Sequence, residues 1–245
     1  AIGASLMRQP YKGARGDMWT GVQLTTDEIF SGILRKAASK GLRLQVQCAG
    51  GAAIDKVLGM FADIDREMPI RDQRYVIEHC QFPSRENMKL CRELGIIPTT
   101  TTNFFWNYGS IYLRSFGEEI ANGAIPFRTW LDEGVPVVQS TDGRPYDPIF
   151  TFWQSLARRD GVTGHVFGLP EQKLTRAEAL RIYTHNVARV MFWENRIGSL
   201  EAGKLADLVV LSDDIMTMPE DRIPEAKVLA TVLAGKAVHG ADVLS

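Results

Sequence analysis

Side chains that can bind a metal or move a proton stand at the ends of predicted strands in this chain. Cys48 ends the stretch LRLQVQC, His79 ends RYVIEH, threonines 99–102 end IIPTTTT, and Asp142 follows VPVVQST. Parallel strands bring their carboxyl ends to one edge of a sheet, where functional residues gather. Imidazole, carboxylate and thiolate are all ligands of Zn²⁺-type cations. The pattern therefore predicts a metal site from His79 and Asp142, and leaves open whether Cys48 joins it.

Each of these residues also has a purely structural interpretation. A histidine at the end of a strand is often a hydrogen-bonded, partly buried residue, and Asp142 fits an Asx turn. Cys48 fits better as a small buried apolar residue than as a ligand or a nucleophile. The period of two in LRLQVQC puts Cys48 on the same face as Leu44 and Val46, and we expect that face to be the one from which a ligand points into the site.

Aromatic residues are dense over 104–112, which we interpret as a loop that either covers the core or forms a substrate lid. Trp106 and Tyr108 in this stretch are weak candidates for contact with an apolar part of a substrate. Arg144, close to Asp142, is a further candidate that either meets a substrate carboxylate or forms a local salt bridge.

Strand and helix patterns alternate along the chain, which is typical of a parallel sheet with crossover helices. Three helices are expected to begin after the N-capping residues Thr25, Ser84 and Thr175. The first of these helices carries an apolar stripe, formed by Ile29, Ile33, Leu34, Ala37 and Ala38. Strands are expected at 42–48, 74–80, 96–102 and 135–141.

Four βα units leave two architectures open. One is a complete open sheet of the flavodoxin type, and the other is half of a (β/α)₈ barrel, because a whole barrel takes about 250 residues. The pattern changes near residue 197, so we divide the chain into an α/β part, 1–197, and a β-rich part, 198–245, that ends in a hairpin over AGK.

Composition excludes several classes of protein. The 245 residues are 45% apolar and carry a net charge of -1, which argues against nucleic acid or a membrane surface as the main partner. No apolar run approaches the roughly 20 residues that span a bilayer. Three cysteines are too few for a disulfide framework, which favours a reducing compartment, the cytoplasm.

Several longer segments resemble one known family. They are RYVIEHCQFP, LDEGVPVVQSTDGRPYDP, the block GSLEAGKLADLVVL and VLATVLAGKAVHG. Together they are similar to the carboxyl-terminal half of the amidohydrolase superfamily, in its YtcJ-like amidohydrolase 3 group. The resemblance implies strands equivalent to 5–8 of a (β/α)₈ barrel, over residues 1–197, followed by the β-rich segment of a composite β-sandwich over 198–245.

The resemblance also implies a site and an activity. His79 matches the metal-binding histidine of the sixth strand, and Asp142 matches the eighth-strand aspartate that assists the attacking water. The implied enzyme is a metal-dependent hydrolase that cleaves amide-like C–N bonds in a small-molecule substrate. It is expected to bind one or two divalent metal ions, with zinc as the expected metal.

Two departures from the family pattern stand out. No H-x-H pair occurs in the chain, and the fifth-strand motif HAIGDAA reads CAGGAA, with Cys48 interpreted as replacing the histidine and Gly51 the acidic residue. A half barrel leaves a sheet edge and a core open, so we expect a homo-oligomer or a partner that supplies the amino-terminal half. The alternative function is a non-catalytic relative whose metal site is incomplete or empty.

Overall fold

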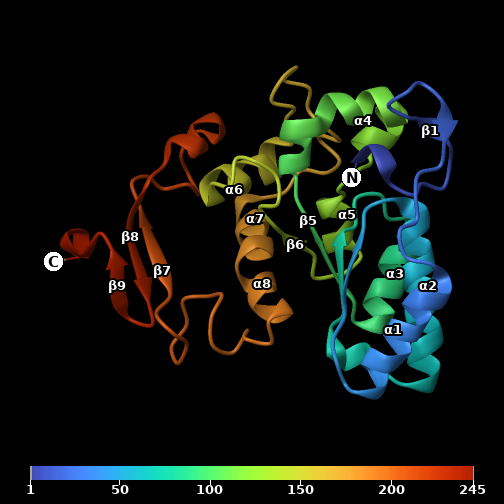
Figure 1. The fold of residues 1–245 in the computed structure, drawn as a ribbon. Helices are drawn as coiled ribbons and strands as arrows, with labels where there is room; N and C mark the ends of the chain where they lie inside the picture. Colours follow the sequence, from blue (N-terminus) through green and yellow to red (C-terminus); the bar gives the residue numbers. More distant parts are fainter. Residues whose placement is uncertain (1, 245) are drawn as a thin grey trace.

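The structure, a computed structural model, describes residues 2–244. Its centre is a sheet of four parallel strands (Figure 1). In spatial order these are β3 (Gln45–Cys48), β4 (Val76–His79), β5 (Ile97–Thr100) and β6 (Val138–Gln139). The α/β architecture with a parallel sheet is therefore confirmed. Because spatial order equals chain order, the flavodoxin alternative, in which the order reverses at a switch point, is excluded.

Helices connect the strands, and α1 to α3 lie together on one side of the sheet (Figure 1). Right-handed crossovers that always advance in the same direction place their helices on the same face. The helices are α1 (Asp27–Ser39), α2 (Gly51–Glu67), α3 (Arg85–Leu94), α4 (Asn103–Asn122), α5 (Phe127–Asp132), α6 (Pro148–Ala157), α7 (Arg176–Tyr183) and α8 (His185–Val190).

The main core lies between the sheet and these helices. Ile54, Leu58 and Phe61 of α2 are fully buried, as their helical spacing predicts, and they belong to one apolar cluster with Ile77 of β4 and Cys91 of α3. Burying an aliphatic or aromatic side chain of this size stabilises the fold by about 1.5–3 kcal/mol.

The other face of the sheet carries polar side chains on β3, β4 and β5. Gln45 and Gln47 of β3 are exposed, and Gln47 pairs in register with Glu78 of β4, which in turn pairs with Thr99 of β5. Side chains of paired residues in parallel strands share a face, so these four residues lie together. The Gln45 amide donates a hydrogen bond to the Glu78 carboxylate.

Helix α8 is tied to the amino-terminal ends of the strands. The Asn186 side chain donates to the Val137 carbonyl at 2.8 Å, and Arg74 donates to the Arg189 carbonyl at 2.6 Å. Arg43 bonds the Val190 carbonyl. The helical segment predicted from Thr175 is confirmed, but it is broken at Thr184 into α7 and α8.

One helix lies where the sequence pattern predicts a loop, and a second occupies a stretch for which no element is predicted. Helix α4 covers the aromatic stretch 104–112, because Phe104, Phe105 and Tyr112 share one buried side of it. Helix α6 begins with Asp147, whose carboxylate accepts from the Ile149 and Phe150 amides. Asp at the N-cap followed by Pro at the first helical position was the available signal for α6.

Helix α1 differs in detail from its prediction. Its N-cap is Thr26 and not Thr25, because the Thr26 hydroxyl accepts from the Ile29 amide at 3.3 Å. Leu34 is buried, whereas Ile29 and Ile33 are 57% and 49% exposed. Helix α1 packs against α2, and the predicted stripe is only partly buried.

A second sheet, antiparallel, lies apart from the first near the carboxyl end (Figure 1). It comprises β7 (Leu208–Leu211), β8 (Val228–Leu233) and β9 (Lys236–His239), with the predicted hairpin between the last two. The remaining elements are β1 (Tyr11–Lys12), β2 (Met18–Trp19) and the 3₁₀ turns η1 (Ile2–Ala4), η2 (Arg71–Gln73), η3 (Glu220–Glu225) and η4 (Ala241–Leu244). Within residues 2–244 no helix has the length and apolar character to cross a membrane.

Candidate metal-binding site at the carboxyl ends of the strands

His79 and Asp142 meet at the carboxyl edge of the parallel sheet. The Nδ1 atom of His79 lies 3.5 Å from the Oδ2 atom of Asp142. His79 is the last residue of β4 and has a φ of 69°, which is uncommon for a non-glycine residue and turns the chain at the strand end. The His79 side chain is 20% exposed and that of Asp142 is 54% exposed, so the pair remains accessible to a small ligand.

The loop that carries Asp142 is held by the beginning of α4. The Asn103 side chain donates to the Gly143 and Pro145 carbonyls at 3.0 and 3.1 Å. Asn107, one turn later, donates to the Arg144 carbonyl at 2.5 Å. Residues four apart share one side of a helix, so the two asparagines act on the same loop. Neither asparagine is predicted as a site residue from the sequence, although their spacing of four after a strand end is a usable signal.

Cys48 pairs in register with His79, but its side chain is buried in the apolar core and does not lie on the open face of the sheet. Cys48 is 6% exposed and belongs to the apolar cluster between sheet and helices, near Cys80 and Cys91. Burial raises the pKa of the Cys48 thiol to about 12, so it is protonated at neutral pH. The face shared by Val46 and Cys48 is therefore the helix-facing one, and Gln47 occupies the open face.

The candidate substrate contacts fall into two groups. Tyr108 is 42% exposed, and its ring centre lies 6.1 Å from that of Phe104. The ring centre of Phe104 in turn lies 5.6 Å from that of His79. Tyr108 therefore contacts the site only indirectly, through the ring of Phe104. Trp106 instead packs edge-on against Phe150 and Trp153 of α6, at 5.1 and 5.8 Å.

Arg144 follows Asp142 by two residues. Its guanidinium carbon lies 5.9 Å from the centre of the Tyr146 ring, which is a contact within its own loop. Its role towards a substrate stays a prediction, as do those of Trp106 and Tyr108.

The donor atoms of His79 and Asp142 suit one metal ion. Two ligand atoms at about 2.1 Å from a tetrahedral Zn²⁺ lie about 3.4 Å apart, close to the 3.5 Å found here. Catalytic zinc sites use three protein ligands. Among residues 2–244 no group of three His, Cys, Asp or Glu side chains could hold a metal. The pair therefore fits as two ligands of a set that these residues do not complete.

Comparison with known proteins identifies the family. A sequence model described as "Amidohydrolase family" matches residues 2–239. N-substituted formamide deformylase of Arthrobacter pascens is 29% identical over 203 residues, which are 82% of this chain and 37% of that protein. Putative amidohydrolase YtcJ of Bacillus subtilis is 23% identical over 96% of this chain and 44% of its own length.

Solved structures agree on the fold. An uncharacterized metal-dependent hydrolase from Pyrococcus horikoshii superimposes with a TM-score of 0.74 and 25% identity, covering 90% of this chain and 44% of that one. A zinc-bound adenosine deaminase from Xanthomonas campestris gives a TM-score of 0.61 at 20% identity, covering 88% of this chain and 49% of that one. This chain spans less than half the length of each of these relatives. Since the family model covers nearly all of its residues, the chain belongs to the amidohydrolase family.

Proposed function

We propose that this chain contributes the carboxyl-terminal half of a (β/α)₈ barrel, residues 1–197, to a metal-dependent hydrolase of amide-like C–N bonds. Residues 198–245 contribute strands to a β-sandwich in this proposal. The observation that carries it is the 3.5 Å approach of His79 Nδ1 to Asp142 Oδ2 at the carboxyl edge of a parallel sheet. In barrel enzymes that edge is where catalytic residues stand.

The two residues have different roles in the proposed reaction. A divalent ion, zinc first, supplies Lewis-acid activation of water and of the scissile carbonyl. His79 holds the ion through a ring nitrogen. Asp142 accepts a proton from the attacking water and passes it to the leaving nitrogen, as base and then acid. Its 54% exposure leaves room for water and substrate to reach the carboxylate.

The remaining ligands have to come from residues beyond this chain. On the polar face of the sheet, Gln45 and Gln47 are exposed and Glu78 is half-buried. The missing half of the barrel or a second copy of the chain would cover that face and complete the site. N-substituted formamides are the first substrates to test, because the deformylase of Arthrobacter pascens is 29% identical to this chain.

Zinc titration against a chromophoric chelator tests the role of the pair. The wild-type chain is compared with His79→Ala, Asp142→Asn and the control His239→Ala, which changes an exposed residue of the β9 hairpin. We expect zinc affinity to fall at least tenfold in the first two variants and to stay unchanged in the control. Hydrolysis of N-benzylformamide with added zinc is measured in parallel.

The same data address the non-catalytic alternative. That alternative is favoured by the lack of a third donor within residues 2–244. A folded chain that binds zinc no more tightly than its His79→Ala variant would support this alternative and overturn the metal-binding role proposed for this chain.

A further inference from the structure

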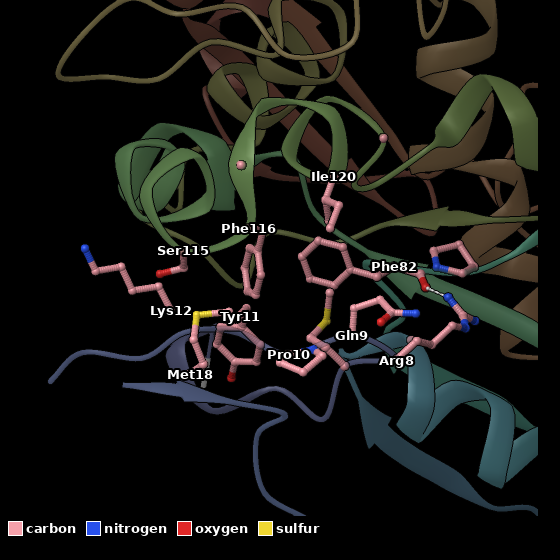
Figure 2. A pocket seen from close by; sticks show the side chains of 15 residues that line it. Arg8, Gln9, Pro10, Tyr11, Lys12, Met18, Phe82, Ser115, Phe116 and Ile120 are labelled. Atoms are coloured by element: carbon pink, nitrogen blue, oxygen red, sulfur yellow. Dashed lines mark hydrogen bonds between the residues drawn. The ribbon is translucent and has the colours of Figure 1, made fainter. Parts of the chain in front are cut away.

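A cavity of about 520 Å³ lies outside the sheet, between the β1–β2 hairpin and α4 (Figure 2). Pockets for small ligands have volumes of about 300–1,000 Å³. Neither His79 nor Asp142 lines this cavity, so it is separate from the candidate metal site.

Three aromatic rings form the apolar part of the cavity. The centre of the Phe116 ring, on α4, lies 4.8 Å from the ring centre of Tyr11 of β1 and 5.0 Å from that of Phe82. All three residues are at most 6% exposed. Met18 and Ile120, at 64% and 39% exposure, add apolar surface open to solvent. Because the rings are held by one another, the surface they offer to a ligand is rigid.

A smaller cavity of about 260 Å³ adjoins the first and shares Lys12 with it. Lys12, Arg15 and Arg114 line this second cavity, and Figure 2 shows Lys12 extending to one side of the three rings. No hydrogen bond or ion pair of these three cationic side chains is found among the described residues. The only acidic residue of the hairpin is Asp17. An excess of positive charge therefore stands beside the apolar surface.

Other polar groups around the larger cavity are already engaged. Arg8, on the opposite side of Figure 2, donates two hydrogen bonds to Asp55 at 2.7 Å and further ones to Asn87 and the Phe82 carbonyl. The amino terminus of α2 is satisfied by the Leu6 carbonyl, which accepts from two of its amides. An anion would therefore meet the Lys12 side and not the Arg8 side.

We propose that the two cavities form one binding site for an amphipathic organic carboxylate. Its aromatic or alkyl body lies on Tyr11, Phe116 and Phe82, and its carboxylate lies near Lys12 and Arg114. The inference is independent of the proposed hydrolase activity, because it uses none of the residues of the candidate metal site.

Isothermal titration with a matched pair of probes tests this proposal. 4-Phenylbutyrate carries the carboxylate, and 4-phenyl-1-butanol has the same apolar body without charge. We expect the carboxylate to bind at least tenfold more tightly than the alcohol, and its affinity to fall as salt concentration rises.

Variants assign the two parts of the site. Lys12→Met and Arg114→Met should each weaken 4-phenylbutyrate binding about three- to tenfold without changing alcohol binding. Lys36→Met, on exposed α1, is the control and should bind like wild type. Ile120→Trp should block both probes, and circular dichroism verifies its folding. No binding of 4-phenylbutyrate, equal affinity for both probes, or equal losses in all three charge variants would overturn the site.

Discussion

At the scale of single residues, the orientation of one strand changes the interpretation of the site. Cys48 shares the helix-facing side of β3 with Val46, while Gln47 shares the open side with Glu78. A period of two identifies two faces of a strand but not which of them is covered by helices. The structure thus places Gln47, and not Cys48, on the open face of β3.

Substitution of Cys48 tests this assignment. Cys48→Ser places a hydroxyl without a designed partner in the apolar core, so we expect a loss of about 1–2 kcal/mol in the free energy of unfolding. Zinc affinity should stay within twofold of wild type. Urea denaturation and the zinc titration measure both quantities. Gln47→Ala, on the exposed face, should cost less than about 0.5 kcal/mol. A tenfold loss of zinc affinity in Cys48→Ser would return Cys48 to the ligand set.

At the scale of secondary-structure elements, one buried cation joins three segments. Arg158, the C-cap of α6, is fully buried and donates to the carbonyls of Phe167, Ile125 and Ala124 at 2.6, 2.8 and 2.9 Å. Burial lowers the pKa of its guanidinium to about 9, so it remains charged at neutral pH. It thereby fixes the loop after α6 to the chain segment between α4 and α5.

Removal of this cation should be costly. Arg158→Met removes the side-chain donor from all three carbonyls, although the Ile125 carbonyl still accepts from the Phe127 amide, and we expect a loss of about 3 kcal/mol in the free energy of unfolding. Arg159→Met is the matched control, because the Arg159 side chain is 41% exposed and its ion pair with Asp221 is 3.5 Å long. The control should cost less than about 1 kcal/mol. Similar losses in both variants, measured by denaturant unfolding, would show that the carbonyl contacts add nothing specific.

At the scale of the whole molecule, the parallel sheet exposes polar side chains at its β3 edge, whereas Val138 and Gln139 of β6 are buried. Strands β3 and β6 are its two edge strands within residues 2–244, and Ile29 and Ile33 expose apolar surface on α1, which packs against α2. Edge strands with apolar neighbours are sites of association between chains.

We therefore expect the chain of residues 1–245 to associate in solution. Sedimentation velocity at micromolar concentration should show dimers or larger species. Ile33→Glu, which places a charge on the exposed side of α1, should shift the distribution towards monomer. Val162→Glu, at a loop position that is 85% exposed, is the control and should leave it unchanged. A monodisperse wild-type monomer would contradict the expectation.

The sequence alone determined the order of strands and helices, several helix caps, the family, and the positions of His79 and Asp142 at strand ends. These features depend on local rules, such as the capping box that Ser84 forms with Asn87, which neighbouring residues satisfy among themselves. Tertiary structure decided the rest: that Gln47 and not Cys48 lies on the open face, that Asn103 and Asn107 hold the Asp142 loop, and that a basic, aromatic cavity lies beside α4. Each of these depends on contacts between segments far apart in the chain, and no local pattern records which distant segment will cover a given face.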